Sequence, residues 1–274
     1  MPAIDIPVRL GVQLQPQHHA SYGAVRDAVT RLEDMGVDVL FNWDHFYPLS
    51  GDPDGTHFES WTMLAAWAEQ TERVEFGALV NCNSYRNPDL QADMARTVDH
   101  ISKKGGDTGR FIFGTGSGWF ERDYVEYGYE FGTAGSRLDD LAEALPRIEA
   151  RWEALNPAPT RKIPVLIGGK GEQKTLRLVA RHADIWHSFV DPAEMPHKLD
   201  VLARWADKEG RDLSGLVLSN ELGHRDDRAD ALFDAGVRLF TLGISGDRLD
   251  YDRVQHWLTW RDERNGSAGT VVDA

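Results

Sequence analysis

A histidine and an aspartate stand side by side in the segment NWDHFYP, directly after an apolar run. The charge of a histidine changes near neutral pH, so His45 can give a proton to a bound substrate or take one from it. Asp44 can fix the tautomer of that ring or bond to a ligand. The structural alternative is an aspartate that caps a turn beside a half-exposed histidine. The position of the pair in the fold decides between these two roles.

The segment GTGSGWF places three closely spaced glycines after a second apolar run, Phe-Ile-Phe. Glycine is used where the backbone turns sharply or approaches a ligand closely. A buried strand that runs through Gly116, Ser117 and Gly118 into a helix is a common ligand-site arrangement in α/β proteins. We expect Trp119, with Trp43 at an earlier strand end, to line the pocket of a flat ligand.

A second glycine turn, IGGKG, joins an apolar run to a predicted helix and contains Gly168, Gly169, Lys170 and Gly171. Backbone N–H groups at the start of a helix bind phosphate, and Lys170 adds a positive charge. The motif GxxxxGK[ST] of the P-loop is absent. A tight turn without a ligand is the alternative reading of these glycines.

The segment NCNSYRNP adds amides, a hydroxyl and a guanidinium near the end of another apolar run. Arg86 either binds an anionic ligand or forms a surface salt bridge. Cys82 is the only cysteine, has no neighbouring base, and is predicted to be a small buried residue. We predict no metal site, with zinc as the weaker alternative, because no set of histidines and carboxylates has ligand spacing. The histidines near the same face are His18, His19, His57 and His187.

These segments belong to a chain of 274 residues in which apolar runs alternate with helical patterns. About eight strand–helix units follow one another, which predicts a single (β/α)₈ TIM barrel over residues 1–264. The last ten residues have the composition of a flexible C-terminal tail. The carboxyl ends of barrel strands build the active site, so the catalytic role of His45 is favoured. The expected strands span residues 8–14, 37–43, 74–80, 110–115, 163–167, 184–189, 215–221 and 237–242.

The net charge of −14 argues against nucleic acid and anionic membrane partners, because both require a basic surface. The first residues lack the pattern of a signal peptide, and no run of apolar residues is long enough to span a bilayer. A single cysteine fits a reducing compartment. We therefore expect a soluble, cytoplasmic protein whose partner is a small-molecule substrate.

The ordered set of segments LGVQL, WDHF, SYRNP, GTGSGWFERDYVEYGYEFGTAGSRL and IPVLIGGKGEQKTLRLVARHADIWH covers most of the chain. Together these segments resemble the bacterial luciferase-like superfamily, in particular its branch that uses the deazaflavin coenzyme F420. The resemblance implies a (β/α)₈ barrel, a homodimer, and a cofactor that lies across the carboxyl ends of the strands.

The resemblance also implies roles for particular residues. The peptide Leu79–Val80 aligns with a non-proline cis bond that bulges against the cofactor ring. We predict that His45 is the catalytic residue and that Trp43, Trp119 and His187 line the substrate pocket. The residues implied to bind the cofactor are Asp44, Leu79, Val80, Asn81, Gly116, Ser117, Gly118, Gly168, Gly169, Lys170 and Gly171.

One position departs from the sugar-phosphate dehydrogenases of this branch. They carry a glutamate where this chain has Trp119, which argues against a sugar-phosphate substrate. The first hypothesis is an F420-dependent oxidoreductase that transfers a hydride to or from a small organic molecule, with Arg86 or Lys170 near the anionic F420 tail. The alternatives are an FMN-dependent monooxygenase that uses reduced flavin and O₂, and a non-catalytic flavin- or F420-binding protein.

Overall fold

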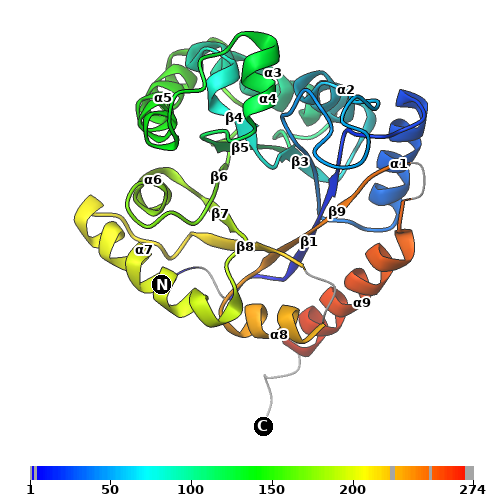
Figure 1. Ribbon diagram of the computed structural model, residues 1–274. Helices are drawn as coiled ribbons and strands as arrows, with labels where there is room; N and C mark the ends of the chain where they lie inside the picture. Colours follow the sequence, from blue (N-terminus) through cyan, green and yellow to red (C-terminus); the bar gives the residue numbers. More distant parts are fainter. Residues whose placement is uncertain (1, 3–4, 223–225, 247–248, 269–274) are drawn as a thin grey trace.

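The computed structural model describes residues 2, 5–222, 226–246 and 249–268. Parallel strands form a closed ring, and helices surround it (Figure 1). The strands are β1 (Arg9–Leu14), β2 (Val39–Asn42), β3 (Glu75–Ala78), β4 (Asn81–Cys82), β5 (Phe111–Gly116), β6 (Val165–Gly168), β7 (Ile185–Ser188), β8 (Val217–Glu221) and β9 (Leu239–Ile244). They are ordered β3-β2-β1-β9-β8-β7-β6-β5-β4, and a pairing of β3 with β5 closes the barrel.

Helices connect successive strands on the outside of this ring. In the described ranges, no helix combines the length and the apolar composition needed to cross a membrane. The helices are α1 (Tyr22–Asp34), α2 (Ser60–Gln70), η1 (Asn83–Tyr85), α3 (Pro88–Lys103), α4 (Glu121–Tyr127), α5 (Ala134–Ala154), α6 (Thr175–His182), η2 (Pro192–Glu194), α7 (Met195–Glu209), α8 (Asp226–Asp234) and α9 (Tyr251–Ala268).

The barrel has two apolar layers because side chains alternate along a strand. One layer fills the interior of the ring with Val39, Phe41, Ile112, Leu166, Ile185 and Leu239. The residues between them, such as Leu40, Phe113 and Trp186, pack against the helices in the main core. The expected (β/α)₈ barrel is therefore confirmed, and each expected strand is present.

The third expected strand, residues 74–80, ends earlier than predicted, and a short additional strand follows it. β3 ends at Ala78, and β4 resumes at Asn81 on the far side of a cis peptide bond between Leu79 and Val80. The expected cis bond is confirmed, and the carbonyl of Leu79 accepts a hydrogen bond of 2.7 Å from Nε2 of Gln13. The short β4 pairs only with β5, so it lies outside the ring of eight.

Two glycines are required where the Val80 side chain meets the neighbouring strands. A Cβ atom on Gly116 would lie 2.8 Å from Cγ2 of Val80, and one on Gly168 would lie 3.0 Å from Cγ1. Both separations are closer than ordinary carbon–carbon contacts. The glycine-rich ends of β5 and β6 therefore accommodate the chain segment that joins β3 to β4.

Two helices, α4 and α5, follow β5 and are separated by a short loop. Gly128 ends α4 in the left-handed conformation with φ 74°. Thr133 then begins α5 with a capping box, in which Thr133 and Ser136 exchange side-chain and backbone hydrogen bonds.

The last helix continues beyond the expected end of the domain. α9 extends to Ala268 and so includes residues 265–268 of the predicted tail, whereas residues 269–274 lie outside the described ranges. The Asn265 side chain accepts a hydrogen bond of 2.8 Å from the Val8 N–H and donates one of 3.0 Å to the Val8 carbonyl. This amide ties the last helix to the start of the first strand.

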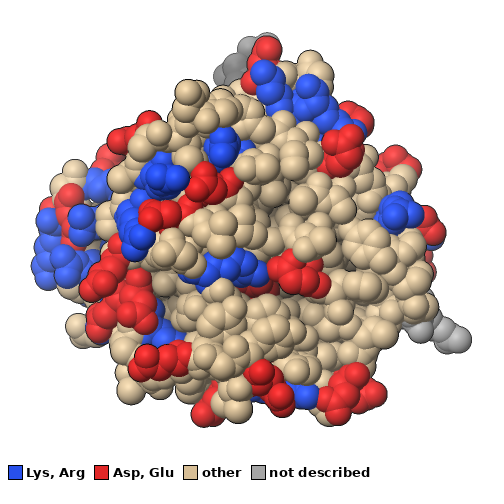
Figure 2. All heavy atoms as spheres, turned by 90° about the horizontal axis from the view of Figure 1, so that it is seen from above, with Lys and Arg blue, Asp and Glu red and all other residues tan. Residues whose placement is uncertain are grey.

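The surface drawn in Figure 2 carries charges of both signs. Lysine and arginine side chains lie beside aspartate and glutamate side chains on this face, rather than forming one continuous basic area. This distribution agrees with the acidic net charge of −14.

Replacing Asn265 with Ala tests the tie between α9 and β1. The loss of two partly buried hydrogen bonds should lower the free energy of unfolding by about 1–3 kcal/mol, as measured by urea denaturation. Gln255→Ala, at an exposed position of the same helix, is the matched control and should change stability by less than about 0.5 kcal/mol. Equal effects of the two substitutions would contradict a structural role for Asn265.

Candidate active site

His45 lies just beyond the carboxyl end of β2 and is held by a carboxylate that is distant in sequence. Its Nδ1 lies 2.7 Å from Oδ2 of Asp123, in the first turn of α4. Asp123 is fully buried, and the His45 side chain is 11% exposed. An ionised carboxylate only accepts hydrogen bonds, so Nδ1 carries a proton. Nε2 has no partner among the described residues and is available to a ligand.

The Asp123 carboxylate joins three segments at the barrel mouth. Its Oδ1 accepts a hydrogen bond of 3.1 Å from the Phe46 N–H, and Oδ2 accepts one of 3.0 Å from the Tyr85 hydroxyl. These bonds satisfy the buried charge and fix the orientation of the imidazole. The arrangement suits a histidine that exchanges a proton through Nε2.

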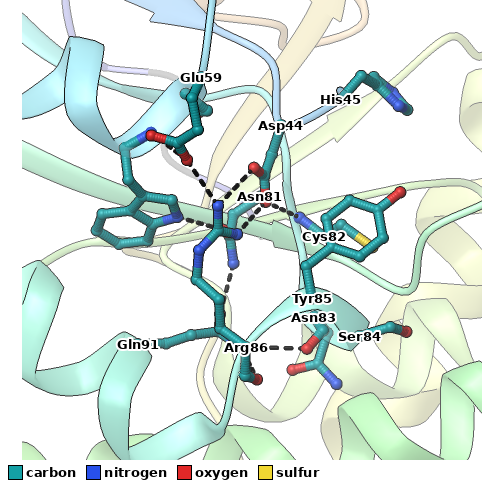
Figure 3. Close-up of polar contacts among 12 residues, drawn as sticks. Asp44, His45, Glu59, Asn81, Cys82, Asn83, Ser84, Tyr85, Arg86 and Gln91 are labelled. Carbon is teal, nitrogen blue, oxygen red and sulfur yellow. Dashed lines mark hydrogen bonds and ion pairs between the residues drawn. The ribbon is translucent and has the colours of Figure 1, made fainter. Parts of the chain in front are cut away.

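The suggestion that Asp44 fixes the tautomer of His45 is wrong. His45 points away from Asp44 in Figure 3 and bonds to Asp123 instead. Asp123, which holds the ring, is 78 positions away in the sequence, so neither spacing nor adjacency identifies Asp123 as the partner of His45. The only signal in the sequence is an acidic residue shortly after the GTGSGW segment.

Asp44 instead forms a buried ion pair with Arg86. Arg86 donates to its two oxygens at 2.6 and 3.0 Å, and the Cys82 N–H donates at 3.0 Å (Figure 3). Burial raises the pKa of Asp44, and the Arg86 guanidinium opposes that shift. The pair connects the end of β2 to the loop after β4. Cofactor binding by Asp44 is untested and stays a prediction.

Arg86 is not the exposed cation that an anionic cofactor tail would need. Its side chain is 11% exposed, and Nη2 also donates to Glu59 at 2.8 Å. Asn81 belongs to the same network, because its Oδ1 accepts hydrogen bonds from Trp61 at 2.6 Å and Arg86 at 3.3 Å. Cys82 is buried as expected, and burial raises the pKa of its thiol.

Three aromatic rings meet the His45 imidazole edge to face. The centroid distances are 5.9 Å to Trp43, 5.7 Å to Trp119 and 5.5 Å to Phe120. The two tryptophans expected to line a pocket thus both contact the candidate catalytic residue. Trp43 also donates a hydrogen bond of 3.1 Å to Nε2 of His57. Burial lowers the pKa of His57 to about 4, so this ring is neutral at pH 7.

At Gly118, the loop after β5 adopts a backbone conformation that only glycine suits. Gly118 has φ 79°, and an added Cβ atom would lie 2.0 Å from the Tyr124 hydroxyl. The carbonyl of Gly118 accepts a hydrogen bond of 3.1 Å from Nε of Arg137, and that of Ser117 accepts one of 3.4 Å from Tyr124. The loop is therefore held in place beside Trp119.

The turn at 168–171, at the carboxyl end of β6, contains hydrogen-bond donors that could bind an anion. The Gly169 N–H already donates to the His187 carbonyl at 3.0 Å, so that amide is not available. The N–H groups of Lys170 and Gly171 donate to no group in the described part of the chain, and the Lys170 side chain is exposed. Two adjacent free N–H groups and an ammonium group fit a phosphate.

His187 lies beside this turn, because it is paired in register with Gly168. Its Nδ1 lies 2.9 Å from the Ser219 hydroxyl, whereas Nε2 is buried and has no partner. Burial lowers the pKa of His187 to about 4, so the ring is neutral at pH 7. A neutral imidazole with an unpaired nitrogen is suited to a hydrogen bond with a ligand.

The burial of His187 predicts a loss of stability in acid. Because its folded pKa is below the unfolded value near 6.5, the unfolded state binds the proton first as the pH falls. Stability is therefore full above pH 6.5 and decreases towards pH 4, by about 3 kcal/mol for this group. Urea denaturation of His187→Gln between pH 7 and pH 4.5 should show a shallower decrease. An unchanged decrease would contradict the neutral buried state.

The comparisons with known proteins agree with this architecture. A protein of Mycobacterium tuberculosis that is named provisionally as a coenzyme F420-dependent oxidoreductase is 25% identical in an alignment that covers 86% of this chain and 72% of the relative. The structure of an F420-dependent secondary alcohol dehydrogenase with an F420–acetone adduct superposes with a TM-score of 0.76 at 17% identity, over 88% of this chain and 95% of that one.

Monooxygenases have the same fold. The monooxygenase RslO1 of Streptomyces bottropensis superposes with a TM-score of 0.68 at 15% identity, over 90% of this chain and 95% of that one. The sequence profile of the luciferase-like monooxygenases matches residues 4–267, nearly the whole length of the chain. The chain therefore belongs to the luciferase-like monooxygenase family, a family of oxidoreductases.

Proposed function

We propose that this protein is an F420-dependent oxidoreductase that transfers a hydride between the deazaflavin and a small organic substrate. The observation that carries the proposal is the His45–Asp123 pair at the mouth of a luciferase-like barrel. F420 is favoured because a relative and a structure with the same fold are named for this coenzyme.

The residues at the mouth fit such a cofactor. The free N–H groups of Lys170 and Gly171, with the Lys170 ammonium, would hold its phosphate. Val80, which packs between the glycine-rich ends of β5 and β6, would support its ring system, and Nε2 of His187 offers a hydrogen bond. When bound, the deazaflavin supplies the hydride acceptor or donor.

His45 would move the proton that accompanies hydride transfer. With Nδ1–H bonded to Asp123, the neutral ring presents the lone pair of Nε2, which takes the proton of a substrate hydroxyl during oxidation. In the reverse direction, the protonated ring gives that proton to the substrate. The negative charge of Asp123 stabilises the imidazolium, and the rings of Trp43 and Phe120 limit the access of water.

A monooxygenase that uses reduced FMN and O₂ is the second candidate, favoured by the likeness to RslO1. F420 and FMN share a ribityl phosphate, so the turn at 168–171 suits both. A non-catalytic binding protein would bind one of these cofactors without turnover. The homodimer and the cytoplasmic location belong to the proposal as well, and light scattering of the purified protein tests the homodimer.

Titration of the purified apoprotein with F420 and with FMN tests the identity of the cofactor. We expect F420 to bind with micromolar or tighter affinity, and Lys170→Gln to weaken binding by about tenfold through loss of a charge-assisted phosphate contact. Lys174→Gln is the matched control, because this exposed lysine is already paired with Asp139 at 2.6 Å. Binding of FMN without binding of F420 would refute the leading proposal.

Substitutions at the His45–Asp123 pair test the proton transfer. His45→Ala should lower kcat by about 10²–10⁴ if the ring is the general acid or base. Asp123→Asn should cause a loss of similar size, because an amide can donate to Nδ1 and select the wrong tautomer. The rates are measured as F420 absorbance changes with any accepted substrate, and circular dichroism confirms that each variant is folded.

Tyr85→Phe is the control for these variants, because it removes one hydrogen bond from the Asp123 carboxylate but keeps the contact with His45. Its kcat should fall by less than about tenfold. If His45→Ala is as active as the parent protein, His45 is not the proton carrier. If the parent protein binds F420 but turns over no substrate, the non-catalytic alternative is favoured.

A further inference from the structure

We propose that the substrate of this protein is an uncharged molecule with a flat apolar group, such as an aromatic or alicyclic alcohol or ketone. Trp43, Trp119 and Phe120 would hold this group against His45. The inference rests on the proposed function for the reaction itself, but the pocket and its ligand can be examined without the cofactor. We call these three rings and the imidazole the aromatic pocket.

The first argument is the geometry of the rings. All three are nearly perpendicular to the imidazole, with interplanar angles of 81° for Trp43, 74° for Trp119 and 84° for Phe120. Trp43 follows β2, whereas Trp119 and Phe120 precede α4, so two separate elements supply the walls. Flat apolar groups bind well between such rings through stacked or edge-to-face contacts.

The second argument is the exposure of Trp119. Trp43 is almost fully buried, whereas 62% of Trp119 is accessible. The loop that carries Trp119 is held by the hydrogen bonds of Ser117 and Gly118, so this exposure accompanies an ordered backbone. A large apolar ring that is exposed beside a candidate catalytic residue indicates a surface that a ligand covers.

The third argument is charge. In the described part of the chain, no lysine or arginine forms a hydrogen bond, an ion pair or a cation–π contact with the four rings of the aromatic pocket. The nearest fixed charge is the carboxylate of Asp123, in contact with His45. The other histidine in contact with the pocket, His57, is neutral at pH 7. A phosphate or carboxylate would therefore find no cation here and would be repelled by Asp123.

The fourth argument is the small number of hydrogen-bonding groups. The indole N–H of Trp43 is already bonded to His57, and Nδ1 of His45 to Asp123. Within the ring contacts described above, Nε2 of His45 and the indole N–H of the exposed Trp119 are thus the groups left for a polar substrate atom. So few groups match a single hydroxyl or carbonyl on an otherwise apolar molecule.

Binding of matched ligands to the full chain tests this inference. Acetophenone is the uncharged aromatic probe, and benzoate is its anionic counterpart of nearly the same size. Dissociation constants are measured by isothermal titration calorimetry in the apoprotein and with F420 or FMN present. Acetophenone should bind at least about tenfold more tightly than benzoate in one or more of these conditions.

Variants identify the site of binding. Trp119→Ala should weaken acetophenone binding by about tenfold, and Trp119→Phe should retain most of the affinity, because it keeps an aromatic face. Trp119 is exposed, so neither variant removes buried core. Leu90→Ala, at an exposed apolar residue of α3, is the control and should bind acetophenone as the parent protein does.

Equal affinity for acetophenone and benzoate, an unchanged affinity in Trp119→Ala, or no acetophenone binding in all three conditions would each overturn the inference. These outcomes differ from failure of the proposed function. If acetophenone binds in a Trp119-dependent way but F420 does not bind, the pocket stands and the cofactor assignment fails. If F420 binds and acetophenone does not, only the inferred substrate class fails.

Discussion

The active-site end of this barrel depends on one buried carboxylate. Asp123 has no exposed surface, so its charge is stable only if hydrogen bonds replace the lost water. Three groups provide them: the imidazole of His45, the backbone N–H of Phe46 and the hydroxyl of Tyr85. They come from the loop after β2 and the loop after β4, and α4, which follows β5, carries the carboxylate to them. The same contacts that satisfy the charge therefore orient the imidazole.

The surrounding structure makes this arrangement rigid through a second ion pair and a steric contact. Asp44 and Arg86 join the end of β2 to the loop that carries Tyr85, so they position two of the groups around Asp123. At the ends of β5 and β6, Val80 packs closely against Gly116 and Gly168. A larger residue at either position would have to displace Val80 or its own strand end.

The sequence predicts the barrel well because each strand and helix has a local signal. Apolar runs of strand length alternate with helical patterns, and the closed parallel ring follows from that order. The cis bond between Leu79 and Val80 is expected only through the family resemblance, and the short strand β4 that follows it is not predicted. The His45–Asp123 pair has no local signal, because its two members are 78 positions apart. Asp44, the direct neighbour of His45, is the more obvious partner in the sequence. The buried position of Arg86 has no local signal either, because a single sequence does not show that Asp44 and Glu59 pair with it.

The two sides of the mouth differ in polarity, and this difference would orient a bound cofactor and substrate. The turn at 168–171 presents free N–H groups and the ammonium of Lys170, so it favours an anion. The aromatic pocket around His45 presents ring faces and a nearby carboxylate, so it disfavours one. A cofactor with a phosphate at one end and a flat ring at the other would place its phosphate at the turn. The ring would then extend towards His45, whose aromatic neighbours and nearby carboxylate suit an uncharged partner.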